Sequence, residues 1–314
     1  MRFRIVFFGT PAFAVPSLQA LLDGPDTVVG VVCQPDRPAG RGQQLRTPPV
    51  KQLAQQHGLA VAQPLRLKSG EFPEQLRAWS PDLAVVAAYG RILPAPMLAT
   101  PRRGCINVHA SLLPKYRGAA PIQWAVLNGE PETGVTIMQM NERMDEGDVY
   151  LQRTTPIGVD ETYGALQARL AGIGAAALRD ALAGLAAGSL VATPQDHAGA
   201  TLAPLTHKEQ GAIDWTRAAV DIARAVRGFN PWPSAFTTLG GKRLKLYRAH
   251  ALDAASDALP GTVVATAGGI RVATGAGVLA VEELQLEGRK ALDAATFARG
   301  SGLTVGERLG DART

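Results

Sequence analysis

Cysteine is scarce in this chain of 314 residues, which contains two cysteines. Cys33 and Cys105 both lie in apolar segments and do not have the C-x-x-C spacing. This excludes a disulfide-stabilised scaffold and a four-cysteine zinc site. Free thiols in apolar segments are typical of the reducing cytosol, so we expect a cytoplasmic protein.

Long hydrophobic runs are also missing. Although 46% of the residues are hydrophobic, apolar runs such as Leu83–Ala88 are far shorter than the ~18 residues that a membrane helix needs. Near the N-terminus, Gly9–Pro11 interrupts the run Phe3–Phe8 before the apolar region of a signal peptide could form. The composition therefore predicts a soluble globular chain that does not act at a membrane.

The common catalytic and metal-binding motifs are absent as well. The sequence contains no H-E-x-x-H, no G-x-S-x-G, no Walker A motif and no G-x-G-x-x-G after the first expected strand. Its five histidines have no metal-ligand spacing. These absences argue against zinc hydrolysis, serine hydrolysis and P-loop use of ATP, and we expect no bound metal.

Short apolar runs alternate with helical patterns from residue 1 to about residue 188. Continuous apolar strands between helices are typical of a parallel sheet that is covered on both faces. The pattern predicts an α/β domain with a doubly wound, mainly parallel, Rossmann-like sheet. The expected strands are Phe3–Phe8, Thr27–Cys33, Leu83–Ala88, Cys105–His109 and Val135–Met140, and the expected helices are Ala14–Leu22, Val50–His57, Glu71–Trp79, Ala120–Leu127 and Tyr163–Ala187.

A different pattern follows this domain. Residues 189–204 contain Pro and Gly and show no periodicity, so we expect a linker there. One helix is expected at 217–227, with Thr216 as its N-cap. The rest of the chain predicts a small β-barrel or sandwich, with strands expected at 235–239, 243–249, 261–265, 270–274 and 278–286. The predicted domains are thus 1–188 and 205–314.

The net charge of +5 is unevenly distributed along the chain. Basic residues cluster in the stretches 34–51, 102–117 and 217–248, whereas acidic residues dominate 130–148. Clusters of this kind favour an anionic partner, although charged residues that only solvate helix faces and loops give the same composition.

Polar side chains gather where the expected strand Cys105–His109 ends. Residues two apart face the same side of a strand, so we expect Asn107 and His109 to project together. The carboxyl end of a parallel strand is where open α/β sheets place their ligands. An amide beside an imidazole suits stabilisation of an oxyanion and transfer of a proton. Polar residues that only cap neighbouring loops would leave the same pattern.

A carboxylate follows the expected strand Val135–Met140. Asp145 lies in a loop after this strand, and a carboxylate next to His109 would hold the imidazole in one tautomer. An aspartate that serves only the turn explains Asp145 equally well, because spacing alone does not bring it to His109.

Together these residues resemble a known signature. The run Asn107-x-His109-x-Ser111-Leu112-Leu113-Pro114-x-x-Arg117-Gly118, followed by Asp145-x-Gly147, is similar to the signature of the folate-dependent formyltransferases. The resemblance covers nearly the whole chain, and further matching blocks are Phe8–Pro11, Gln34–Gly42, Ala88–Pro94, Gly118–Gln123, Ile213–Trp215 and Phe229–Pro233.

The resemblance implies a reaction and a catalytic set. The co-substrate is 10-formyltetrahydrofolate, and the formyl group passes to the α-amine of methionine on initiator tRNA, giving N-formylmethionyl-tRNA for translation initiation. Asn107 and His109 would flank the tetrahedral oxyanion, and Asp145 would orient His109. No metal and no covalent enzyme intermediate are required.

The resemblance also implies binding residues. The folate pocket would be shaped by Ser111, Leu112, Leu113 and Pro114, and Tyr89–Pro94 would line the pterin pocket. The second domain would be an OB-like barrel that binds tRNA, and the protein would be a monomer with no obligate protein partner.

For the tRNA, the resemblance points to the basic loop that contains Arg37 and Arg41, and Arg41 matches the family's tRNA-contacting arginine. Cations of the barrel would contact phosphates without reading sequence. These cations are Lys242, Arg243, Lys245 and Arg248. Each of the four is equally well explained as an ordinary surface charge.

Two other functions remain open at this point. Another enzyme of formyl-folate, such as a hydrolase or a transferase acting on a purine precursor or a sugar amine, would share Asn107, His109 and Asp145. The stretches 35–42 and 229–233 favour the tRNA enzyme over these. An RNA-binding module without catalysis would explain the basic clusters and the barrel, but it leaves the catalytic set unexplained.

Overall fold

A computed structural model describes residues 2–39 and 44–310 of the chain. The chain forms two compact units. The first comprises residues 1–121, 132–156 and 167–204, and the second comprises 122–131, 157–166 and 205–314. Residues 189–204, which the sequence predicts as a linker, lie within the first unit.

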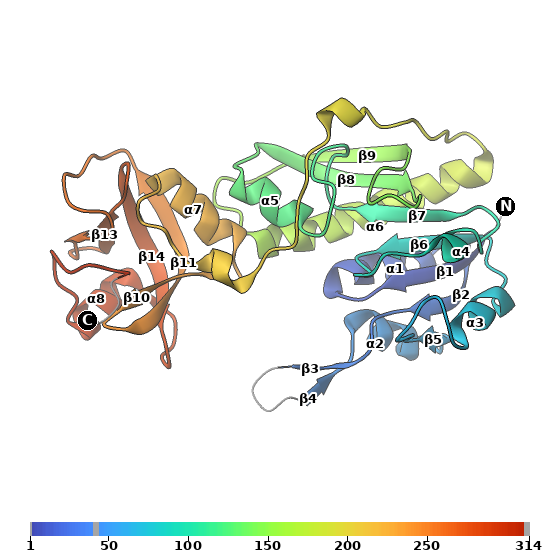
Figure 1. Ribbon diagram of the computed structural model, residues 1–314, viewed down its shortest axis with the longest axis horizontal. Helices are drawn as coiled ribbons and strands as arrows, with labels where there is room; N and C mark the ends of the chain where they lie inside the picture. The colour runs from blue at the N-terminus through green and yellow to red at the C-terminus, as the bar shows by residue number, and fades with distance from the viewer. Residues whose placement is uncertain (1, 40–43, 311–314) are drawn as a thin grey trace. The chain divides into compact units, whose positions relative to one another are not determined.

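The first unit contains a seven-stranded sheet in the order β5-β2-β1-β6-β7-β8-β9 (Figure 1). The neighbouring pairs from β5 to β7 in this order are parallel, whereas β8 is antiparallel to β7 and β9 is antiparallel to β8. This confirms the mainly parallel sheet. The strands are β1 Arg4–Gly9, β2 Thr27–Val32, β5 Val61–Ala62, β6 Leu83–Ala87, β7 Cys105–His109, β8 Glu132–Gln139 and β9 Val149–Pro156, and β3 Arg37–Ala39 pairs separately with β4 Gln44–Arg46.

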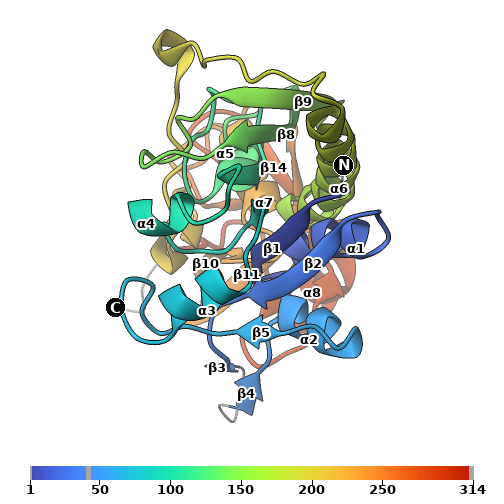
Figure 2. The ribbon, with the colours of Figure 1, turned by 90° about the vertical axis from the view of Figure 1, so that its right-hand side faces the viewer.

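Helices cover both faces of this sheet, with α1 and α6 on one face and α3 and α4 on the other (Figure 2). The doubly wound arrangement is therefore confirmed. The elements are η1 Ala12–Ala14, α1 Val15–Leu22, α2 Pro49–Gln56, α3 Phe72–Ala78, α4 Ala95–Leu98, α6 Tyr163–Ala187 and η2 His197–Gly199.

The side chains of β1 point alternately to the two faces of the sheet. Val6 and Phe8 belong to the cluster that includes Phe72 and Leu76 of α3. Phe8 also meets the ring of Tyr89 edge-on, with centroids 5.4 Å apart. Since β1 is buried on both sides from residue 5 to residue 9, its unbroken apolar run is the expected signature of a central parallel strand.

Helix α6 is long and apolar enough to cross a membrane by length and composition alone. Its buried residues Leu170, Ala177, Leu178 and Ala181 recur on one helical face. On that face a Cβ atom at Gly174 would lie 2.8 Å from Val108 Cγ1 of β7. Close packing on the sheet therefore accounts for the apolar composition.

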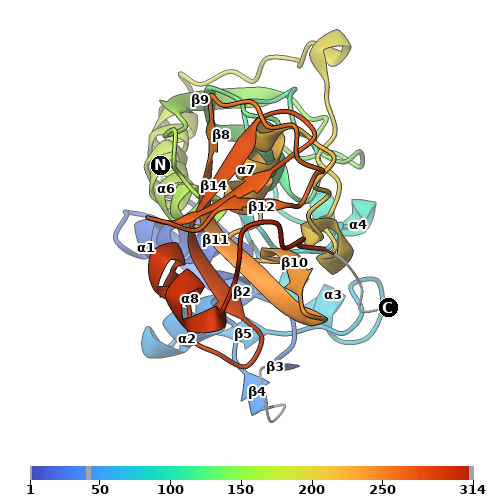
Figure 3. The ribbon, with the colours of Figure 1, turned by 90° about the vertical axis from the view of Figure 1, so that its left-hand side faces the viewer.

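The second unit is built on a six-stranded antiparallel sheet, ordered β10-β11-β14-β13-β12 with β15 paired to β14 (Figure 3). The sheet encloses a core that includes Trp215, Val226, Leu246 and Phe297, which agrees with the small barrel expected. The elements are α5 Pro121–Leu127, η3 Lys208–Gly211, α7 Ala219–Gly228, β10 Ala235–Leu239, β11 Lys242–Leu252, β12 Val263–Ala265, β13 Ile270–Ala273, β14 Val278–Leu286, β15 Leu292–Asp293 and α8 Ala294–Ser301.

Two sequence predictions for the second unit are wrong. The helix expected at 217–227 is α7, which begins at Ala219 with Ala218 as its N-cap. The predicted cap, Thr216, instead donates its hydroxyl to Asp214 Oδ1 at 2.6 Å. A further helix that was not expected, α8, follows Asp293, whose carboxylate caps it by accepting from Thr296 N at 2.8 Å.

Candidate active site

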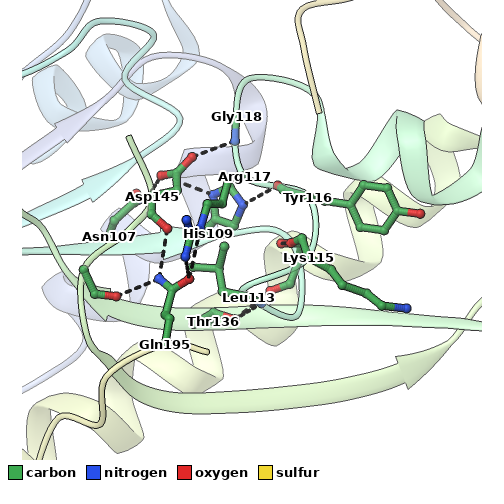
Figure 4. Close-up of polar contacts among 12 residues, drawn as sticks. Asn107, His109, Leu113, Lys115, Tyr116, Arg117, Gly118, Thr136, Asp145 and Gln195 are labelled. Atoms are coloured by element: carbon green, nitrogen blue, oxygen red, sulfur yellow. Dashed lines mark hydrogen bonds and ion pairs between the residues drawn. The ribbon is translucent and has the colours of Figure 1, made fainter. Parts of the chain in front are cut away.

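The end of β7 presents Asn107 and His109 on the same side of the sheet, as predicted (Figure 4). The intervening Val108 is buried on the opposite face, toward α6. Asn107 is half-buried, and His109 is buried with 5% of its surface exposed. The packed strand therefore fixes both side chains at the carboxyl end of β7, the end at which open α/β sheets place their ligands.

Asp145 reaches both of these side chains. It lies in the turn after β8, and its Oδ1 is 3.5 Å from Asn107 Nδ2 and 3.7 Å from His109 Nδ1. Its Oδ2 accepts a hydrogen bond of 2.8 Å from the backbone N–H of Gly118. The structure thus brings together the three residues that spacing alone could not connect.

The surroundings of His109 indicate its tautomer. The Nε2 atom lies 3.0 Å from the carbonyl oxygen of Tyr116, which can only accept a hydrogen bond, so we assign a proton to Nε2. The Nδ1 atom then faces the Asp145 carboxylate, whose Oδ1 is 3.7 Å away. The ring therefore has a fixed partner at Nε2 and an acidic side chain near Nδ1.

Internal hydrogen bonds hold the loop after β7. Ser111 Oγ donates to Lys115 O at 2.6 Å, and Leu113 N donates to Thr136 Oγ1 at 3.1 Å. Gln152 of β9 donates to Leu113 O at 2.7 Å. Of the predicted folate residues, Ser111 and Leu113 are buried, whereas Leu112 and Pro114 are partly exposed.

A buried arginine of this loop pairs with a buried glutamine. Arg117 Nη2 donates to Gln195 Oε1 at 2.7 Å. Gln195 in turn donates to the carbonyl oxygens of Asp145 and Gly147. The sequence alone gives no sign of a role for Gln195, because a single glutamine in a segment without periodicity carries no signal.

A cavity of about 530 Å³ lies in the first unit. Its wall includes Ile92, Leu93 and Pro94, which belong to the block expected to line the pterin pocket. Charged residues at the cavity are Lys68, Arg77 and Glu142. The volume falls within the range of small-molecule sites, about 300–1,000 Å³.

Both cysteines are unsuited to nucleophilic chemistry. Burial raises the pKa of the Cys33 thiol to about 11 and that of Cys105 to about 12. Both sulfurs therefore stay protonated at neutral pH, whereas the thiolate is the reactive form. Within 2–39 and 44–310, no group of three or more His, Cys, Asp or Glu side chains could hold a metal ion.

The basic loop of the first unit is a β3–β4 hairpin, in which Arg37 pairs opposite Arg46. Both arginines are exposed. Arg41 lies outside the described residues. At the base of the hairpin, Lys51 Nζ contacts Asp36 Oδ2 at 2.8 Å and Gln63 Oε1 at 2.7 Å, so the strands start from a fixed polar cluster.

The predicted cations of the barrel all lie on β11, but their surroundings differ. The guanidinium of Arg243 lies 4.3 Å from the centroid of the Phe236 ring, and Arg248 pairs with Glu282 at 2.9 Å. Lys242 is exposed and Lys245 is partly exposed. Leu244, which lies between Arg243 and Lys245, points into the core, so these two cations project from the outer side of the strand.

Comparison with known proteins places this site in a family. The formyl transferase family model matches residues 1–182, and the model of the formyl transferase C-terminal domain matches residues 206–302. The chain belongs to the formyl transferase family. This confirms the resemblance found in the sequence.

Named relatives of this formyl transferase cover nearly its whole length. A methionyl-tRNA formyltransferase of Desulfotalea psychrophila is 52% identical over 95% of this chain and 93% of its own. A methionyl-tRNA formyltransferase of Trichlorobacter lovleyi is 50% identical over 98% and 96%. Among solved structures, an N-formyltransferase of Helicobacter canadensis, in complex with folinic acid and dTDP-3-aminofucose, matches with a TM-score of 0.67 and 16% identity over 90% of this chain and 98% of its own, which shows the shared fold.

Proposed function

We propose that this formyl transferase moves the formyl group of 10-formyltetrahydrofolate to the α-amine of methionyl-initiator tRNA, giving N-formylmethionyl-tRNA for translation initiation. The observation that carries the proposal is the convergence of Asn107, His109 and Asp145 at the end of β7. Relatives that are 49–52% identical over at least 95% of the chain are named methionyl-tRNA formyltransferases, which supports tRNA as the acceptor.

The chemistry divides among the three side chains. When bound, the folate supplies the formyl carbon, and attack of the amine creates a negative oxygen and requires a proton at N10. Asn107 Nδ2 would donate a hydrogen bond to that oxygen. Its contact with Asp145 Oδ1 is long, at 3.5 Å, and so leaves Nδ2 available as a donor. His109 flanks the oxygen. Asp145 holds the imidazole in place and accepts the proton that the attacking amine must lose; this proton then passes to N10 as the bond between N10 and the formyl carbon breaks, so the proton count balances.

The folate would occupy the first unit. We assign its pterin to the cavity beside Ile92, Leu93 and Pro94, with Leu112 and Pro114 as contact residues. Ser111 and Leu113, whose side chains are buried, would contribute by fixing the loop. No metal takes part in this scheme.

The tRNA would contact basic residues of both units. In the first unit these are Arg37 and Arg41, and in the second they are Lys242, Arg243, Lys245 and Arg248. Contacts of this type supply affinity that depends on salt rather than on sequence. We further propose that the protein acts as a monomer in the cytoplasm.

The test is formyl transfer from 10-formyltetrahydrofolate to methionine-charged initiator tRNA, with free methionine and a tRNA-free blank alongside. Formylmethionyl-tRNA as the product, with no product from free methionine, would support the proposal. Deformylation of the folate at the same rate without tRNA would instead identify a hydrolase and leave the basic residues without a role.

A further inference from the structure

We propose that Gln195 is a positioning residue for the reaction and that it acts by fixing the turn that carries Asp145. The proposal rests on the function proposed above, in which Asp145 holds His109 and accepts a proton. It gives the segment 189–204, which the sequence predicts as a linker, a part in the active site.

The side-chain amide of Gln195 uses its full hydrogen-bonding capacity. Its Nε2 donates to Asp145 O at 2.9 Å and to Gly147 O at 2.7 Å. Its Oε1 accepts from Arg117 Nε at 3.1 Å and from Arg117 Nη2 at 2.7 Å. An amide offers two N–H donors and two acceptor lone pairs, and here both hydrogens and both lone pairs have partners in a buried site (Figure 4).

The turn that receives these hydrogen bonds has a backbone that needs support. Asp145 has a φ of 54°, in the left-handed region that non-glycine residues rarely adopt. Gly147 lies so close to β8 that a Cβ atom would be 1.7 Å from Gln139 O. Such a conformation persists where the surrounding structure over-determines it, and the donors from Gln195 are placed on the carbonyls of these same two residues.

The hydrogen bonds of the Gln195 side chain, here called the clamp, also reach the loop whose backbone binds the Asp145 carboxylate. Arg117 directly precedes Gly118, whose N–H donates to Asp145 Oδ2. The guanidinium of Arg117 also faces Glu146 Oε1 at 3.6 Å and His197 Nδ1 at 3.0 Å. Gln195 therefore ties the Asp145 turn to the loop at a second point. A shift of the turn would lengthen the contacts of Asp145 with Asn107 and His109, which already measure 3.5 and 3.7 Å.

The segment that carries Gln195 is itself anchored on both sides. Before it, Thr193 and Val149 exchange two backbone hydrogen bonds of 2.8 Å. After it, Tyr116 N donates to Thr201 Oγ1 at 2.9 Å, and Ala203 N donates to Arg117 O at 2.7 Å. These hydrogen bonds fix the segment on both sides of Gln195, so that its side chain stays within reach of the turn and the loop.

The variant that tests the clamp is Gln195→Glu. A glutamate keeps an acceptor for Arg117, so the buried guanidinium keeps its partner. It replaces the donor Nε2 with an oxygen that faces the carbonyls of Asp145 and Gly147, which breaks both bonds to the turn. Thr193→Ala is the matched control, because it lies on the same segment, its side chain is exposed and its bonds to Val149 are made by the backbone.

For Gln195→Glu we expect kcat of formyl transfer to fall by about 10²-fold, the typical effect of displacing a reacting group by about 1 Å. The KM values for the folate and the charged tRNA should change less than about 3-fold, since the contacts that bind the substrates remain. Hydrogen–deuterium exchange should accelerate at the Gly118 amide and across residues 139–148. Thr193→Ala should match the wild type in both measurements.

Normal turnover of Gln195→Glu, or an equal loss in Thr193→Ala, would overturn the proposal, as would unchanged exchange at Gly118. If Gln195→Glu does not fold, the wild-type protein decides. Its Gln195 side-chain amide protons should exchange slowly with solvent, and fast exchange would refute the clamp. If the wild type transfers no formyl group, the proposed function fails, while the exchange data still report on the clamp.

Discussion

Asn107 and His109 illustrate how a strand controls chemistry at the scale of single residues. Their shared direction follows from the two-residue period of β7, and their burial limits the positions that each side chain can take. Both were predictable from the sequence. Their contact with Asp145, at a separation of 38 residues from Asn107, was not, because it depends on how the chain returns after β8.

We expect Asn107→Ala and His109→Ala each to lower kcat of formyl transfer by at least about 10²-fold, since loss of one oxyanion donor typically costs 10²–10³. The folded structure should survive, as judged by circular dichroism. His57→Ala is the control, because His57 is exposed at the end of α2. Turnover near that of the wild type in either active-site variant would contradict the assigned roles.

The raised thiol pKa values of Cys33 and Cys105 give a second prediction at this scale. A thiol whose pKa is about 11 or 12 stays protonated at pH 8, so neither cysteine should react with iodoacetamide in the folded protein within the time that a free cysteine needs. Both should react after unfolding in guanidinium chloride. Rapid labelling of the native protein, measured by mass spectrometry, would show that the sulfurs are exposed.

At the scale of elements, the sequence predicts best where apolar residues follow one unbroken pattern. The strand Cys105–His109 and the helix Tyr163–Ala187 were predicted with the bounds that the structure has. The edge strand β9 was not predicted, because it is largely exposed and polar and so lacks the apolar run that marks a central strand. Helix α8 was not predicted either. It is a short helix whose start depends on the cap at Asp293.

The hairpin β3–β4 yields a prediction about pH. Hydrogen bonds from Lys51, and then from Gln63, lower the pKa of the Asp36 carboxyl. Because this pKa is lower in the folded protein than in the unfolded chain, Asp36 stabilises the fold above its ordinary pKa of about 3.9. That contribution is lost as the pH falls through the lowered value.

Asp36→Asn should therefore have a lower urea midpoint than the wild type at pH 7, and the difference should shrink at pH 3. A difference that stays constant or grows on acidification would contradict the assignment of the ionised carboxylate. The arginines of the hairpin should also be held less firmly in this variant. Its affinity for methionine-charged tRNA should therefore be weaker than that of the wild type at pH 7.

At the scale of the whole molecule, the basic residues proposed to meet tRNA are distributed over both units. Binding of initiator tRNA should weaken steeply as salt rises, with a linear plot of log K against log salt concentration. Replacement of one exposed phosphate-binding cation, as in Lys242→Ala, should reduce the slope by about 1, which filter binding at several salt concentrations can measure. An affinity for initiator tRNA that does not change with salt concentration would refute the electrostatic account.

The contacts between residues 116–117 and residues 201–203 also constrain when the active site can form. A chain is synthesised from its N-terminus, and the strand with Asn107 and His109 leaves the ribosome long before Gln195. The partners of Tyr116 N and Arg117 O are Thr201 and Ala203, so the loop beside Asp145 stays incomplete until almost all of the first unit has emerged. A nascent chain that stops at residue 188 would contain all three proposed catalytic side chains and still lack the frame that aligns them.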